Sequence, residues 1–199
     1  MFFASPPWDS VVYWALDLET GGLDAGKDPI LAVGMVPIRA GRIRLGEGYR
    51  TLVRPGTRPI DPDSIRAHQL VSGEVRDAPP IDDVLSEITR RLAGNVLVVH
   101  QRGIDVPFLQ EACRRTGLRW PAPKVIDTVE LLLRRAKRVR FRTPELPLET
   151  PALMLSLARD AHGLPPYQAH DALTDAIATA ELFLVLRHEL RARTLRDLR

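Results

Sequence analysis

The sequence has almost no cysteine. Its single cysteine, Cys113, excludes a disulfide within the chain and fits a reducing compartment. Cys113 falls in a helical pattern of apolar residues, and we interpret it as a core thiol rather than a nucleophile. The set of cysteines and histidines that a zinc site would require is also missing.

Long apolar runs and sorting signals are missing too. No apolar run approaches the roughly 20 residues that a membrane span requires. Residues 1–10 lack the basic start and the apolar stretch of a signal peptide. There is no Walker phosphate loop, and no Gly-x-Gly-x-x-Gly motif follows a predicted strand. We therefore expect a cytoplasmic protein with no membrane partner.

The composition is that of an ordinary globular protein. The chain has 199 residues, of which 45% are hydrophobic and 27% are charged. This length predicts one domain, residues 1–199, with a core from about residue 11 to residue 190.

The net charge is only +3, but the basic residues are unevenly spread. Residues 134–142 carry six basic side chains and no acid, and Pro144, Pro147 and Pro151 follow. The prolines predict that this segment projects as a loop before the next helix. We predict that it holds nucleic-acid phosphates through Arg138, Arg140 and Arg142. The alternative is a solvated basic surface.

Hydrophobic periodicity predicts strands followed by alternating strands and helices. The expected strands are 11–19, 30–38, 42–53, 96–99 and 125–126. The expected helices are 63–70, 81–92, 106–116, a helix capped by Asp127, 151–161 and 172–190. This order predicts an α/β fold with a mixed five-stranded sheet.

Two acidic residues end the first predicted strand. Asp17 and Glu19 are two residues apart, so their side chains point to the same face. Two carboxylates at such a short distance repel each other unless a cation lies between them. Oxygen ligands of this kind suit Mg²⁺ or Mn²⁺. Asp105 follows another buried strand, where the alternative is a helix N-cap.

His170 and Asp175 are five residues apart. On a helix this spacing is a rotation of about 140°, so the two residues cannot share a face. We therefore place His170 on the loop before the last helix and Asp175 on its first turn. Asp171, between them, is the expected helix cap.

These residues, in this order, resemble the DEDD exonuclease superfamily, specifically its branch with a histidine five residues before the last aspartate. That branch includes the epsilon subunit of bacterial DNA polymerase III, ribonuclease T and oligoribonuclease. The first motif spans Asp17 to Gly22, and the third is His170 with Asp175. The second motif, His100 to Asp105, has Gln101 and Ile104 where asparagine and phenylalanine are usual. We expect these two replacements to alter positioning without abolishing activity.

The resemblance implies a ribonuclease H-like fold with helices on both faces of the sheet, and hydrolysis assisted by two Mg²⁺ or Mn²⁺ ions. Asp17 would bridge both ions, Glu19 and Asp175 would complete one site, and Asp105 would hold the second ion. His170 would take the proton from the attacking water. The expected products are nucleoside 5′-monophosphates released from the 3′ end.

Further residues are expected near the substrate. The backbone of Thr20, Gly21 and Gly22 would meet the terminal nucleotide, because glycine allows close approach. Leu23 and Phe108 would stack against bases or else pack in the core. Structural or substrate roles are open for His68, His100 and Gln101.

The expected partner is the 3′ end of a nucleic acid, and the resemblance favours single-stranded DNA. A polymerase partner is possible, but residues 191–199 form only a short basic end rather than a tail. The oligomeric state is not determined. Two alternatives stay open: an exoribonuclease of the same superfamily, distinguished by contacts to the 2′-hydroxyl, and a non-catalytic nucleic-acid-binding domain.

Overall fold

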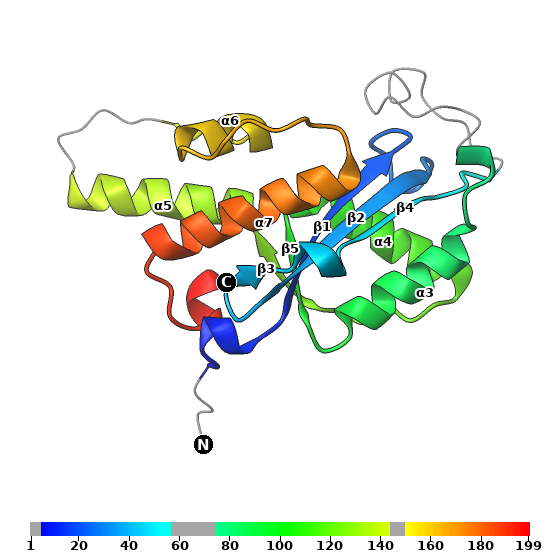
Figure 1. Cartoon of the computed structure of the whole chain (residues 1–199), viewed down its shortest axis with the longest axis horizontal. Helices are drawn as coiled ribbons and strands as arrows, with labels where there is room; N and C mark the ends of the chain where they lie inside the picture. The colour runs from blue at the N-terminus through cyan, green and yellow to red at the C-terminus, as the bar shows by residue number, and fades with distance from the viewer. Residues whose placement is uncertain (1–4, 57–74, 144–149) are drawn as a thin grey trace.

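The structure, a computed structural model, describes residues 5–56, 75–143 and 150–199. A mixed sheet of six strands lies between two groups of helices (Figure 1). The strand order is β3-β2-β1-β5-β6, and β4 also pairs with β2. The strands are β1 (Tyr13–Thr20), β2 (Ile30–Arg39), β3 (Arg42–Ile43), β4 (Tyr49–Leu52), β5 (Val96–Val99) and β6 (Lys124–Asp127).

The helices among the described residues are α3 (Ile81–Leu92), α4 (Arg102–Thr116), α5 (Thr128–Arg142), α6 (Leu155–Ala161) and α7 (Ala172–Glu189). The short 3-10 helices in the same described ranges are η1 (Trp8–Ser10), η2 (Leu45–Glu47) and η3 (Leu195–Leu198). In this part of the chain, no helix is both long enough and apolar enough to cross a membrane.

The central strand β1 is buried on both faces. It runs antiparallel to β2 and parallel to β5. Tyr13 and Ala15 pack on the side of α5 and α7, whereas Trp14 and Leu16 pack on the side of α3 and α4. This alternation places Asp17 and Glu19 on the α7 side. The predicted α/β fold with helices on both faces is confirmed.

The predicted third strand is two strands, so the sheet has six strands rather than five. Residues 42–53 contain β3 and β4 separated by η2. Gly46 and Gly48 lie in this segment, and the Gly48 N–H donates to the carbonyl of Leu45 to close the turn. Glycine favours such an interruption because it has little strand propensity. The predicted helix 63–70 lies outside the described residues.

The helices 81–92 and 172–190 match α3 and α7. Helix α4 begins at Arg102, four residues before the predicted start, because the carboxylate of Asp127 accepts the backbone N–H groups of Gln101 and Arg102 at 3.0 and 2.9 Å. Asp127 also caps α5, as predicted, by accepting the N–H of Val129 at 2.9 Å. Helix α6 begins at Leu155 rather than at residue 151.

The basic segment 134–142 is helical, so its prediction as a loop was wrong. Helix α5 runs to Arg142 because no proline or glycine interrupts residues 128–143. The helix is held against the end of the chain: Arg138 donates to the carbonyl of Leu190, and Arg134 donates to the carbonyl of Asp197 at 2.6 Å.

The core extends beyond the predicted limit at about residue 190. Leu195 and Leu198 are buried in the same cluster as Phe183. Thr194 forms a bridge with Pro7, which ties the two ends of the described chain together.

The N-terminal end of α7 lies very close to β2. A Cβ atom on Gly34 would lie 2.1 Å from the carbonyl group of Ala172, so only glycine fits without movement of the backbone. Gly34 is also the register partner of Asp17 on β1. This close contact brings the first turn of α7 to the carboxylates of β1.

Candidate active site

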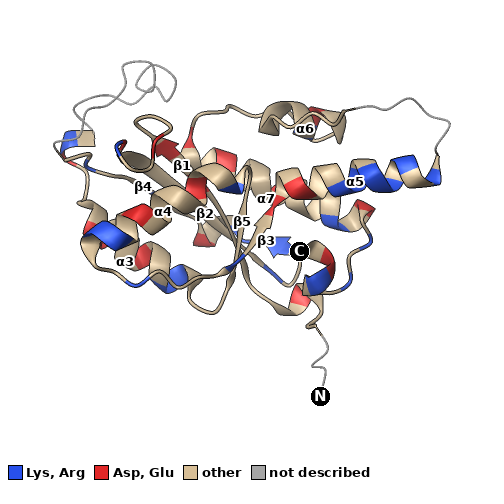
Figure 2. Cartoon of the chain, turned by 180° about the vertical axis from the view of Figure 1, so that it is seen from behind, with Lys and Arg blue, Asp and Glu red and all other residues tan. Residues whose placement is uncertain are grey.

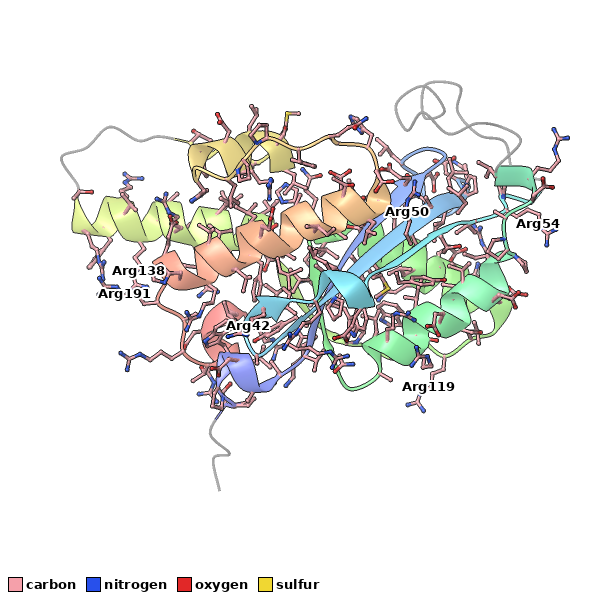
Figure 3. The ribbon with its side chains drawn as sticks, viewed as in Figure 1. Arg42, Arg50, Arg54, Arg119, Arg138 and Arg191 are labelled. Carbon is pink, nitrogen blue, oxygen red and sulfur yellow. The ribbon has the colours of Figure 1, made fainter. Side chains whose placement is uncertain are left out.

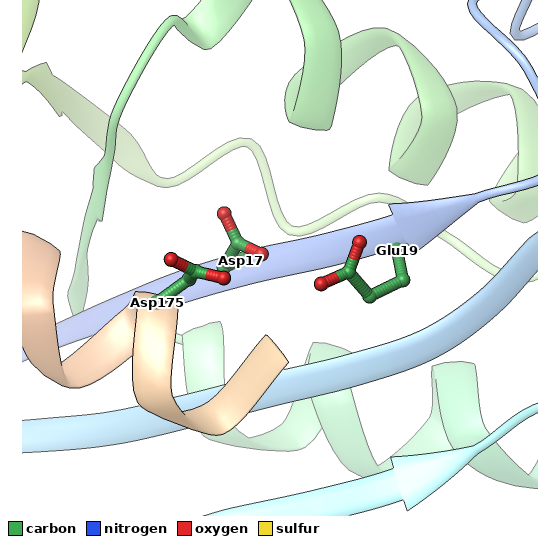
Figure 4. Close-up of side chains that lie close together, drawn as sticks. All are labelled: Asp17, Glu19 and Asp175. Carbon is green, nitrogen blue, oxygen red and sulfur yellow. The ribbon is translucent and has the colours of Figure 1, made fainter. Parts of the chain in front are cut away.

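Three carboxylates from two elements converge at the end of β1. Asp17 and Glu19 extend from β1, and Asp175 extends from the first turn of α7 (Figure 4). One carboxylate oxygen of each residue lies within 4.8 Å of the others. The expected common face of Asp17 and Glu19 and the expected position of Asp175 are both confirmed. This group could hold a metal ion.

Asp105 approaches the same site from α4. It lies in the first turn of that helix and is buried, whereas the N-cap is Gln101. Its carboxylate accepts the backbone N–H of Leu18, which directs it toward β1. Burial, with the charges of Asp127 and Glu19, raises the pKa of Asp105 to about 8. Asp105 is outside the group of three oxygens, but its charge acts on Asp17.

The site concentrates negative charge. Burial and then the charges of Asp105, Asp175 and Glu19 raise the pKa of Asp17 well above its usual range. Among the residues that the structure describes, no lysine or arginine forms an ion pair with Asp17, Asp105 or Asp175. A divalent cation would relieve this repulsion, so the donor set fits a hard metal ion.

His170 lies on the loop before α7, as predicted. It is exposed, its φ is 71°, and its backbone N–H donates to Oδ2 of Asp175 at 2.8 Å. Asp171 is the helix cap, accepting the N–H of Thr174 at 3.0 Å, and it also pairs with Arg50 at 2.7 Å. His170 and Asp175 are therefore joined by a direct hydrogen bond.

Tyr167 is a residue of the site that the sequence motifs do not include. Its hydroxyl donates a hydrogen bond to Asp175, and burial together with that carboxylate raises the pKa of Tyr167. The guanidinium of Arg159 lies 4.9 Å from the centre of the tyrosine ring. Arg159 is buried, and it bonds to Glu181 at 2.6 Å and to the carbonyl of Pro165 at 3.0 Å. Proximity to His170 in the sequence was the only signal that could have indicated Tyr167.

The loop after β1 borders the carboxylates. The hydroxyl of Thr20 donates to the carbonyl of Gly22 at 2.6 Å, and the N–H of Gly21 donates to the carbonyl of Pro29 at 2.8 Å. A Cβ on Gly22 would lie 2.2 Å from Oδ2 of Asp28. Leu23, in the same loop, is 86% exposed.

Other predicted substrate residues have structural contacts. Both ring nitrogens of His100 are engaged, Nδ1 with the hydroxyl of Thr128 and Nε2 with the carbonyl of Leu153, each at 2.7 Å. His100 therefore bridges β5, α5 and the segment before α6. Phe108 is buried in the core. Gln101 is exposed with a φ of 68°. His68 lies outside the described residues.

The structure does not bring the basic residues of α5 to the carboxylates. Arg138 contacts Leu190 at the C-terminal end of α7, whereas Asp175 lies at the N-terminal end of that helix. Fifteen helical residues correspond to about 22 Å along the axis. Figure 2 shows the basic residues of α5, in blue, on the part of the helix that is distant from the end of β1.

Comparisons with known proteins agree with this arrangement. The profile of an exonuclease family, RNase_T, matches residues 14–183. The chain is 35% identical to a DNA polymerase III subunit epsilon-like protein of Rhodobacter capsulatus, over 96% of this chain and 26% of that protein. It is 31% identical to a PolC-type DNA polymerase III of Thermotoga petrophila, over 89% of this chain and 12% of that protein. The chain thus spans about a quarter or less of the length of these relatives.

The fold is similar to that of E. coli Exonuclease I in complex with a dA16 oligonucleotide. The TM-score is 0.76 at 16% identity, covering 90% of this chain and 41% of that chain. This likeness confirms the expected ribonuclease H-like fold. The family match confirms the expected resemblance to the DEDD exonucleases, and the chain belongs to the RNase_T exonuclease family.

Proposed function

We propose that this chain is a metal-dependent 3′→5′ exonuclease that acts on single-stranded DNA and releases nucleoside 5′-monophosphates. The observation that carries the proposal is the convergence of Asp17, Glu19 and Asp175 within 4.8 Å, with Asp105 adjacent. Membership of an exonuclease family supports the same chemistry.

The proposed cofactor is a pair of Mg²⁺ or Mn²⁺ ions. Such ions would supply positive charge to the scissile phosphate and the leaving oxygen, and would make water more acidic. Asp17 is central among the four acids, and it would contribute to both sites. Glu19 and Asp175 would complete one site, and Asp105 would hold the second ion.

His170 is the proposed general base. Imidazole exchanges protons readily near neutral pH, and positioned acid–base groups accelerate reactions substantially. The exposed His170 can reach a substrate, while its backbone is held by the bond to Asp175. The histidine would accept the proton of the attacking water as the bond to the terminal nucleotide breaks.

The terminal nucleotide would lie against the loop after β1. The exposed Leu23 is available to contact a base, and the backbone of Thr20, Gly21 and Gly22 borders the carboxylates. Single-stranded DNA is the preferred substrate in this proposal because the solved structure of E. coli Exonuclease I holds a dA16 oligonucleotide.

The test uses three substrates of equal sequence: single-stranded DNA, duplex DNA and RNA, each labelled at the 5′ end. With Mn²⁺, labelled single-stranded DNA should shorten stepwise, and a blocked 3′ end should prevent the reaction. Preferential shortening of RNA would assign an exoribonuclease instead. Binding without any shortening, in the presence of either metal, would overturn the enzymatic proposal.

A further inference from the structure

A basic groove lies between the C-terminal ends of α5 and α7. It has a volume of about 340 Å³, and its polar lining consists of Arg135, Arg138, Arg142, His188, Glu189 and Arg191. Figure 3 shows Arg138 and Arg191 side by side at this end of the molecule. Arg140 belongs to the same helix but does not line the groove.

The positive charge of the groove is largely uncompensated. Its one acid, Glu189, pairs with Arg135 and also contacts Nδ1 of His162 at 3.2 Å. Within the described part of the chain, Arg142 and Arg191 form no ion pair. Glu189 therefore pairs with one of the four arginines of the groove, and its other partner is His162.

Helix capping explains only part of this arrangement. Cations are favourable near the C-terminal end of a helix, and Arg138 donates to the Leu190 carbonyl there. Helix capping does not require Arg142 and Arg191 to line the same groove. Arg191 moreover has a φ of 52°, a conformation that is unfavourable for a residue with a side chain.

We propose that this groove binds phosphates of a single-stranded nucleic acid upstream of its 3′ end. Guanidinium groups match phosphate geometry through paired N–H donors. Along α7 the groove is about 22 Å from Asp175, so a strand with its 3′ end at the carboxylates would reach the groove only after several nucleotides. This inference rests on the proposed function, and it adds that the affinity for a substrate depends on the length of the strand.

The test compares two matched double variants of the full chain. Arg142→Gln with Arg191→Gln removes two arginines of the groove. Arg42→Gln with Arg119→Gln removes the same charge from two exposed arginines that do not line the groove, both labelled in Figure 3. Binding of a long oligo-dT is measured in EDTA by fluorescence anisotropy over a range of salt concentrations.

The groove variant should bind the long strand more weakly. Its slope of log K against log salt should be smaller by about 1.4, since each lost phosphate contact on a single strand contributes about 0.7. The control variant should retain the wild-type slope. With Mn²⁺, the kcat/KM for a dinucleotide, whose one phosphate would lie at the carboxylates, should be equal in all three proteins.

Equal slopes in the groove and control variants would overturn the proposal, as would a lower kcat/KM of the groove variant on the dinucleotide. Failure of the proposed nuclease activity is distinguishable from these results. The binding measurement in EDTA requires no turnover, so a nuclease-inactive protein with the predicted slopes would still support the groove.

Discussion

The hydroxyl of Tyr167 donates a hydrogen bond to the carboxylate of Asp175. The backbone N–H of His170 donates to the same carboxylate at 2.8 Å. Both donors lie on one loop, which the buried Arg159 fastens through the carbonyl of Pro165. The orientation of Asp175 and the position of the proposed base therefore depend on each other.

Tyr167→Phe should reduce catalysis without unfolding the protein. The change removes the hydroxyl but keeps the ring beside Arg159, so packing survives while Asp175 loses one of its two donors. Loss of a charge-assisted hydrogen bond of about 1.5 kcal/mol corresponds to roughly a tenfold lower kcat. The measurement is kcat and the Mn²⁺ concentration needed for half-maximal rate.

The matched control is Tyr49→Phe, whose hydroxyl bonds to the side chain of Thr51. It should leave both quantities unchanged. If Tyr167→Phe behaves like this control, the hydroxyl has no role in positioning Asp175.

Gly34→Ala should separate α7 from the sheet. The new methyl group would overlap the backbone of Ala172, so relief requires movement of the helix that carries Asp175. Overpacking of this kind costs about 1–3 kcal/mol of unfolding free energy. Urea denaturation should show this loss of unfolding free energy. Nuclease activity should fall by more than the smaller fraction of folded protein explains.

Gly46→Ala is the control for this change, because a Cβ there meets nothing within 4 Å and its φ is not positive. Comparable effects of the two substitutions would contradict the proposed close contact at Gly34.

Asp17→Asn should stabilise the metal-free protein. The pKa of Asp17 is raised in the folded state, so the folded protein binds this proton more tightly than the unfolded chain does. Its ionisation therefore lowers the unfolding free energy as the pH rises above the ordinary value of 3.8. In EDTA the variant should melt higher than wild type at neutral pH, and the difference should shrink toward pH 3.8.

The exposed Asp83→Asn variant controls for the change in net charge. Added Mn²⁺ should raise the Tm of wild type and of the Asp83 variant, but have little effect on the Asp17 variant. A lower Tm of Asp17→Asn in EDTA at neutral pH would show that the carboxylates do not repel each other as described.

His170→Ala should have a lower kcat but an unchanged affinity for metal ions. The imidazole is exposed and the backbone bond to Asp175 does not need the side chain. We expect kcat to fall by about 10²–10⁴, the usual contribution of a positioned general base. Isothermal titration with Mn²⁺ measures the affinity. A loss of affinity as large as that of Asp175→Ala would make His170 a ligand or a structural group.

The spacing of residues in the sequence predicted those parts of the site whose geometry is set by a single strand or helix. The two-residue spacing of Asp17 and Glu19 sufficed because β1 is a regular strand, and the spacing of His170 and Asp175 sufficed because α7 begins between them. The whole of α3 was predictable for the same reason, since its apolar residues recur at helical spacing.

Features that depend on contacts between distant segments were not predictable. The early start of α4 depends on Asp127, which follows it by more than twenty residues. The proximity of Tyr167 to Asp175 depends on the path of a loop without regular structure.

Residues 134–142 have a composition that favours a helix, which is what the structure shows. They were predicted as a loop because the prolines that follow them were given too much weight.

The most direct test of the central claim is release of nucleotides from the 3′ end of single-stranded DNA by three proteins: wild type, Asp17→Ala and Asp83→Ala. The account predicts Mn²⁺-dependent release of 5′-monophosphates by wild type and the Asp83 variant. It also predicts a loss of several orders of magnitude in kcat for Asp17→Ala, which keeps a folded circular dichroism spectrum. Near-normal release by Asp17→Ala, with contaminating nucleases excluded, would contradict the account.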